Sequence, residues 1–136
     1  MKALLSTGKI LFILILSTPF LGCEKSTDLP TENTPNIHTI FTGNFYYDPP
    51  NITILQGEEI RWINDGGLHD VNGEINSLTN ALFNNPETFN SPSTSIIGAE
   101  IYRHTFNTPG FYNYDCSVGG HAINGMTATI NVLAVD

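Results

Sequence analysis

Four side chains that bind metals occur in two short stretches of this chain. Cys116, His121 and Met126 follow one another at intervals of five residues, and His69 lies in the run Gly66-Gly67-Leu68-His69-Asp70. One thiolate, two imidazoles and one thioether are the ligands of a mononuclear type 1 copper site. Zinc is a poorer match, because its structural sites use Cys and His without thioether sulfur. The chemistry indicated is therefore electron transfer.

Each of these residues also has an ordinary structural interpretation when it is considered alone. His69 would suit a polar turn and His121 a surface loop, while Met126 would suit the core side of a strand. Cys116 could be a small buried apolar side chain. Their occurrence together, in an order that can bring a strand end, a loop and the next strand to one point, favours copper.

Residues 1–22 have the pattern of an export signal. Lys2 and Lys9 flank a short basic region, and the apolar stretch 10–20 that follows is too short for a stable membrane-spanning helix. The stretch runs into Gly22-Cys23, which resembles the lipobox of bacterial lipoproteins. That resemblance implies cleavage before Cys23 and lipidation of this residue, and the alternative is an ordinary secretory signal. We therefore expect a membrane-anchored lipoprotein of the cell envelope, facing the periplasm or the cell exterior.

The two cysteines of the chain, Cys23 and Cys116, leave one further alternative, a disulfide between them. If Cys23 is lipidated, Cys116 is a lone thiol in an oxidising compartment. Such a thiol survives best when a soft metal binds it, so the cysteine count also agrees with copper.

The charge balance excludes one class of partner. Thirteen acidic residues but only three basic residues follow residue 22. Nucleic acid is excluded as a partner, because binding it requires clustered Lys and Arg. A basic protein partner is compatible with this charge, and so is an acidic surface that serves solubility alone.

Residues 23–36 begin with Cys23, which the lipobox resemblance implies is lipidated. The rest of this stretch is polar and contains two prolines, which predicts a flexible tether. From residue 37 to residue 136, apolar and polar residues alternate in short runs separated by Gly and Pro, as where Ile60 and Trp62 alternate with Arg61. This pattern predicts one all-β domain, a sandwich or barrel. Residues 72–98 lack such alternation, and we expect a partly ordered excursion there, with one short helical turn, packed by Phe83 and Phe89.

From about residue 37 to residue 135 the chain resembles the cupredoxins of the plastocyanin/azurin type. The matching motifs follow in order: Tyr47-x-Pro49, Gly57-Glu58-x-Ile60-x-Trp62-x-Asn64, Gly66-Gly67-Leu68-His69-Asp70-Val71, Asn85-Pro86-Glu87, Pro109-Gly110-x-Tyr112-x-Tyr114-x-Cys116 and His121-x4-Met126.

The resemblance implies a Greek-key β-sandwich of about seven to eight strands that holds one copper ion. It implies that Cys116, His69 and His121 form a trigonal plane, with Met126 as a weak axial ligand. Asp70 and Ser117 are expected to lie beside the ligands. The family often has Asn directly after the first histidine, where this chain has Asp70. A carboxylate near the thiolate should favour oxidised copper and lower the reduction potential.

These features predict a monomeric carrier that shuttles single electrons between redox partners in the cell envelope. It would dock transiently through a small surface around His121, Ala122 and Ile123. One alternative is a copper-trafficking or copper-storage lipoprotein of the same fold, and another is a copper-free β-sandwich used for adhesion or assembly. Enzymatic activity is not expected, because a thiol hydrolase would leave His69 and Met126 without a role. We assign no ligand role to His38 or His104.

Overall fold

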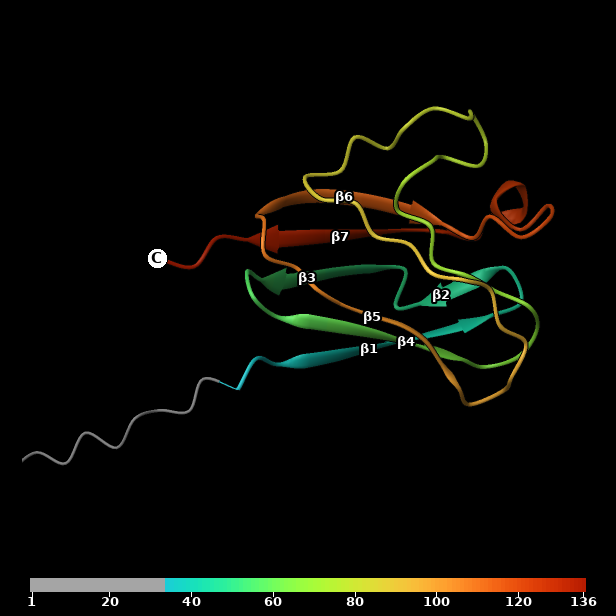
Figure 1. Cartoon of the computed structure of the whole chain (residues 1–136), viewed down its shortest axis with the longest axis horizontal. Coiled ribbons are helices and arrows are strands. Elements are labelled where there is room, and N and C mark those ends of the chain that lie inside the picture. Colours follow the sequence, from blue (N-terminus) through green and yellow to red (C-terminus); the bar gives the residue numbers. More distant parts are fainter. Residues whose placement is uncertain (1–33) are drawn as a thin grey trace, which may run out of the picture. The chain divides into compact units, whose positions relative to one another are not determined.

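The strands follow from the alternation of apolar and polar residues. The computed structural model describes residues 34–136, which form a β-sandwich (Figure 1). One sheet has the order β2–β1–β4–β5 and the other has the order β3–β7–β6. Their bounds are Ile37–Gly43 (β1), Tyr46–Asp48 (β2), Asn51–Leu55 (β3), Glu59–Asn64 (β4), Glu100–Thr105 (β5), Gly110–Asp115 (β6) and Thr127–Leu133 (β7).

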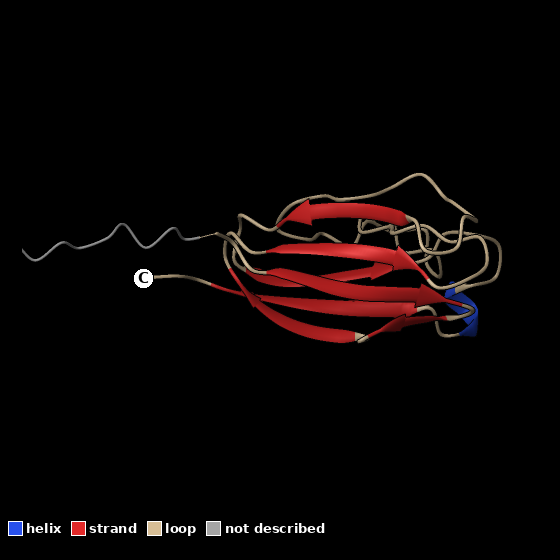
Figure 2. Cartoon of the chain, turned by 90° about the horizontal axis from the view of Figure 1, so that it is seen from below, coloured by secondary structure: helices blue, strands red, loops and turns tan. Residues whose placement is uncertain are grey.

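Each sheet contains one parallel pair of strands. β1 runs parallel to β4 and β3 runs parallel to β7, whereas the other neighbouring strands are antiparallel. Figure 2 shows the strands stacked in layers, with the one short helical segment of the described chain, η1 (Ala122–Asn124), at one end. The predicted all-β sandwich is confirmed, and the described residues form seven strands.

The core lies between the two sheets and is rich in aromatic rings. On β4, Ile60, Trp62 and Asn64 are buried, while Arg61 between them is exposed. Burying each large apolar side chain of this kind contributes about 2 kcal/mol relative to leaving it in water. The core therefore fixes the end of β4, from which one of the metal-binding loops begins.

Residues 72–98 form a long excursion that covers the core beside β5 and β6. The expected helical turn is limited to the carbonyl of Asn76, which accepts hydrogen bonds from the N–H groups of Thr79 and Asn80. Phe89 is fully buried in the core and Phe83 is half-buried. The side chain of Asn85 bonds both the N–H and the carbonyl of Asn113, so it caps the free edge of β6 as another strand would.

The predictions for the signal peptide 1–22, for Cys23 and for the tether fall outside the described residues, except at the end of the tether. There Asn36 donates a hydrogen bond from its side chain to Glu58, and its carbonyl accepts one from the N–H of Glu59. Within residues 34–136, no helix has the length and apolar character needed to cross a membrane.

The two ends of the sandwich differ. At one end the chain enters β1 and leaves β7, and Thr34, Asn36, Val135 and Asp136 line a common pocket there. At the other end lie the β1–β2 turn, the segment after β4 and the β6–β7 connection with η1 (Figure 1). All four predicted ligands belong to segments at this second end.

Candidate metal centre

Three of the four predicted ligands converge at the second end of the sandwich. His69 lies in the segment after β4, Cys116 directly follows β6, and His121 directly precedes η1. One ligand atom from each of these side chains lies within 4.8 Å of the other two. The Sγ atom of Cys116 is 3.4 Å from Nδ1 of His121 and 3.9 Å from Nδ1 of His69. The same ring nitrogen of both histidines therefore faces the sulfur.

A backbone carbonyl fixes the orientation of His69. Its Nε2 lies 2.7 Å from the carbonyl oxygen of Gly66, which can only accept, so Nε2 carries the hydrogen and Nδ1 keeps its lone pair. The loop is held in turn by Asn64, which bonds the carbonyl of Gly67 and the N–H of Gly66. A hydrogen bond at the outer nitrogen is the usual way in which a protein orients a metal-binding imidazole.

The fourth predicted ligand, Met126, is tied to the other two residues of its loop by backbone hydrogen bonds. Its N–H donates to the carbonyl of His121, and its carbonyl accepts from the N–H of Cys116. The Met126 side chain is fully buried. Gly125 makes the turn possible, because its φ of 98° lies in the left-handed region.

The electrostatics of the cluster suit a bound cation. Cys116 is fully buried, and burial raises the pKa of its thiol to about 11, although the N–H groups of Asp70 and Val118 act in the opposite direction. A metal cation at this point would stabilise the thiolate. Burial also lowers the pKa of His69. The neutral imidazole that results is the form that binds metals.

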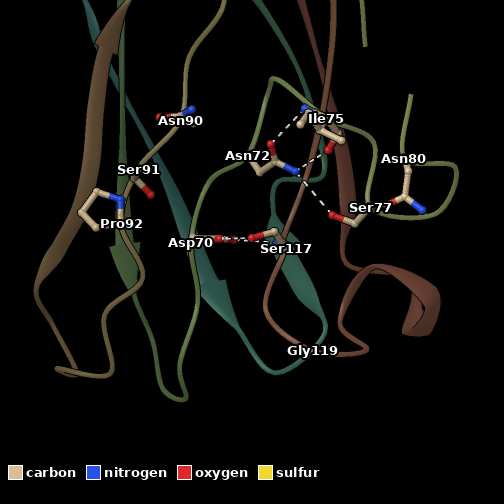
Figure 3. Close-up of a pocket in the computed structure, with 10 residues that line it drawn as sticks. All are labelled: Asp70, Asn72, Ile75, Ser77, Asn80, Asn90, Ser91, Pro92, Ser117 and Gly119. Atoms are coloured by element: carbon tan, nitrogen blue, oxygen red, sulfur yellow. Dashed lines mark hydrogen bonds between the residues drawn. The ribbon is translucent and has the colours of Figure 1, made fainter. Parts of the chain in front are cut away.

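Asp70 and Ser117 lie beside the cluster, and they join its two chain segments. The carboxylate of Asp70 accepts a hydrogen bond from the N–H of Ser117 at 2.7 Å and another from its hydroxyl group (Figure 3). Both residues line a polar cavity of about 550 Å³ that also borders Gly119. The hydrogen bonds link the residue after His69 to the residue after Cys116.

Phe45 is a residue of the site that sequence analysis missed. Its ring, on the β1–β2 turn, contacts the ring of His121 edge to face, with centroids 5.2 Å apart, and it remains 47% exposed. Leu68 and Ile123 are exposed on the two neighbouring segments. We call Phe45, Leu68 and Ile123 the apolar rim. The aromatic run that begins at Phe45 is visible in the sequence, but nothing in it predicts contact with His121, which lies 76 residues further along the chain.

The two other histidines of the chain lie apart from the cluster. His38 contacts Glu58 at 2.9 Å, and His104 contacts Glu87 at 3.0 Å. The donor set of the cluster is therefore one sulfur and two imidazole nitrogens, with Met126 adjacent. Soft sulfur combined with imidazole suits copper. Magnesium prefers carboxylate oxygens as ligands, and none of these four side chains provides one.

Comparisons with known proteins agree with this donor set. The family model described as "Copper binding proteins, plastocyanin/azurin family" matches residues 37–133. A plastocyanin from Scenedesmus fuscus is 31% identical over 96 residues, which cover 67% of this chain and 90% of that protein. The structure of a purple cupredoxin from Nitrosopumilus maritimus is 25% identical with a TM-score of 0.54, covering 71% of this chain and 99% of that one.

An amicyanin structure shows the same fold at 21% identity, with a TM-score of 0.53, and the match covers 71% of this chain and 82% of that one. The family model spans most of the chain and includes all four predicted ligands. The protein therefore belongs to the plastocyanin/azurin family of copper-binding proteins, and its cofactor is copper.

Proposed function

We propose that the protein is a carrier of single electrons, in which Cys116, His69, His121 and Met126 hold one copper ion. The bound copper would supply the redox chemistry by alternating between Cu(II) and Cu(I). The observation that supports this proposal most directly is the approach of the buried Cys116 sulfur to Nδ1 of both His69 and His121.

The hydrogen bonds around the ligands favour transfer of electrons over release of the metal. Gly66 orients His69, Asp70 joins the two ligand segments, and Met126 closes the loop onto Cys116 and His121. Side chains held in this way have little freedom to rearrange when the charge on the metal changes. A site that hands copper to a partner would need ligands that can leave it.

A redox partner would dock on the apolar rim. His121 is only half-buried and lies in contact with Phe45, so its outer edge offers the shortest way from the metal to the surface. The rim is small, which suits a transient complex. The acidic charge of the chain would speed encounter with a basic partner at low ionic strength. We propose that the carrier acts as a monomer.

We further propose that the protein is anchored in the cell envelope through a lipid on Cys23. The support for this is the sequence of residues 1–23 alone. Growth of an expressing bacterial strain with a labelled fatty acid should label the wild-type protein and leave a Cys23→Ser variant unlabelled. Equal labelling of the two proteins would overturn the anchor and leave the copper site unaffected.

The carrier function is tested by titrating the purified metal-free protein with Cu(II) and then with ascorbate. We expect an intense visible absorption band from thiolate-to-copper charge transfer, which saturates at one equivalent and bleaches on reduction. Copper should stay bound in both states during gel filtration, and Cys116→Ser should lose the band. A protein that binds Cu(II) but releases it on reduction would favour trafficking instead.

A further inference from the structure

A series of aromatic side chains leads from β6, which ends directly before Cys116, to the edge of the other sheet. Tyr114, two residues before Cys116, lies edge-on to Trp62 with ring centroids 5.7 Å apart, and its hydroxyl oxygen accepts a hydrogen bond from Nε1 of Trp62 at 3.2 Å. Trp62 on β4 is paired directly with Tyr102 on β5, and their centroids are 5.8 Å apart. Three easily oxidised rings in contact thus connect the metal centre with an edge strand.

The last ring of this series has a base at its hydroxyl group. The hydroxyl of Tyr102 lies 3.3 Å from Nδ1 of His104, whose Nε2 lies 3.0 Å from the carboxylate of Glu87. A carboxylate only accepts, so Nε2 of the neutral imidazole carries the hydrogen and Nδ1 is free to accept the phenolic proton. The side chains of His104 and Glu87 are 20% and 22% exposed, so this end of the series reaches the surface.

The three tyrosines outside this series lack such a base. Tyr47 and Tyr112 donate their hydroxyl hydrogens to backbone carbonyls, which do not take up protons at neutral pH. Tyr46 bonds the carboxylate of Asp65, a weaker base than imidazole, and its ring makes no aromatic contact within residues 34–136. Oxidation of a phenol at neutral pH releases its proton, so the tyrosine beside His104 should lose an electron most readily.

We propose that Tyr114, Trp62 and Tyr102 form a relay that carries oxidising equivalents away from the metal centre. A one-electron oxidant at that end of the molecule gains one electron, which Tyr102 supplies through Trp62 and Tyr114. The phenolic proton moves to Nδ1 of His104, and Glu87 balances the positive charge of the imidazolium. One electron from a small reductant such as ascorbate, together with the return of the proton from Nδ1 of His104, restores the Tyr102 phenol and the neutral imidazole.

The relay would protect the sulfur ligands of the metal site from irreversible oxidation. The sulfur atoms of Cys116 and Met126 are the groups of the cluster most easily converted to oxidised forms. The relay instead places the oxidation on Tyr102 of β5, where a small reductant can reverse it. This role is separate from electron delivery through the apolar rim, and it does not depend on the identity of any partner.

The relay is tested with a photosensitiser attached at the metal-centre end of the full chain. A ruthenium complex is bound to the imidazole of an Ile123→His variant, because Ile123 is 78% exposed on η1. The metal site is filled beforehand with redox-inert Zn(II), and peptide mapping selects molecules labelled only at position 123. Flash photolysis with an electron acceptor then creates the oxidant, and tyrosyl radical formation is followed by absorption and electron paramagnetic resonance.

We expect a tyrosyl radical that is lost in Tyr102→Phe and that forms more slowly in deuterated water, because a proton moves in the same step. In His104→Gln, which keeps a hydrogen-bond acceptor but no base, formation should slow by about tenfold, equivalent to about 1.4 kcal/mol of added barrier. Trp62→Phe should slow it similarly where that variant remains folded. The matched control is Tyr46→Phe, which removes a carboxylate-bonded tyrosine outside the relay and should change nothing.

A radical that disappears in Tyr46→Phe but persists in Tyr102→Phe would overturn the relay. A radical at Tyr102 with the same rate in His104→Gln and without a deuterium effect would overturn the role of the base. Because the experiment uses Zn(II), neither result would bear on the proposed function of the copper-loaded protein.

Discussion

The carboxylate of Asp70 accepts both hydrogen bonds that Ser117 can donate, one from the backbone N–H and one from the hydroxyl group. Both carboxylate oxygens thus act as acceptors. Asp70 is only 7% exposed, so water screens its charge weakly. This pair joins the segments of His69 and Cys116 and places a negative charge next to the metal centre.

Replacement of Asp70 by Asn should raise the reduction potential of the copper protein. A nearby negative charge stabilises Cu(II) more than Cu(I), so its removal favours the reduced state, by an amount on the order of tens of millivolts. Asp65→Asn makes the same charge change on the same segment, at a residue bonded to Tyr46 rather than to Ser117, and should have a smaller effect. Voltammetry of the variants decides the question, and an unchanged or lower potential for Asp70→Asn would refute the electrostatic explanation.

A side chain at Gly67 should damage the metal centre. A Cβ atom there would lie 2.6 Å from Nε2 of His69 and 2.7 Å from Oδ1 of Asn44, and the φ of 94° is unfavourable for other residues. We expect Gly67→Ala to weaken metal binding and to lower the free energy of unfolding by more than about 1 kcal/mol. Gly98 has a similar φ of 79°, but an added Cβ there would meet no other atom. Gly98→Ala therefore measures the cost of backbone strain without a steric clash.

Metal titrations and urea unfolding of both glycine variants provide the measurement. Equal losses in the two variants would mean that backbone strain alone is responsible and that His69 has room to move.

The stability of the metal-free protein should fall in alkaline solution because of Cys116. Burial raises the pKa of this thiol from 9.0 to about 11, so the folded state keeps a proton that the unfolded state has already lost. The contribution is present below pH 9 and disappears as the pH rises to about 11, a loss of about 2–3 kcal/mol in the free energy of unfolding. Urea unfolding across this range should show a shallower decline for Cys116→Ala, and parallel curves for the two proteins would contradict the prediction.

An acidic residue on the apolar rim should slow electron exchange between two copies of the protein. Ile123→Asp places a charge where two identical surfaces must meet, and like charges oppose that contact. We expect the self-exchange rate, measured by nuclear magnetic resonance on mixtures of reduced and oxidised protein, to fall by about tenfold or more at low salt. Leu55→Asp adds the same charge at the opposite end and should leave the rate nearly unchanged. Similar slowing in both variants would show that net charge, not the rim, controls the reaction.

The sequence predicted the strands well where one face is buried. Ile60, Trp62 and Asn64 on β4 alternate with less buried residues, and this period of two determines both the strand and its inner face. The spacing of Cys116 and His121 predicted that their side chains can meet, because only a short loop separates them, and backbone hydrogen bonds tie Met126 to the same loop. His69, far from Cys116 in the chain, was proposed as a ligand because the four donor types match a type 1 copper site, and the family resemblance supported that hypothesis.

Contacts between distant loops could not be predicted in this way. Phe45 meets His121 because the β1–β2 turn and the β6–β7 connection reach the same end of the sandwich, and no local pattern encodes that contact. The side-chain amide of Asn85 makes the hydrogen bonds to the edge of β6 that a neighbouring strand would otherwise make. A single side chain of this kind leaves no repeating pattern in the sequence. Individual side chains hold the excursion 72–98 in the same way. Its course could therefore not be predicted from a repeating pattern in the sequence.

The chain enters and leaves the sandwich at one end, while His121 and the apolar rim occupy the other. The protein can therefore be immobilised through the segment directly before β1 or the segment directly after β7, on a membrane, a bead or an electrode, without the attachment covering the metal centre. The seven residues of β1 separate the two ends by about 23 Å. At that separation, electrons would pass to a diffusing partner at the free end more readily than into the surface that holds the protein.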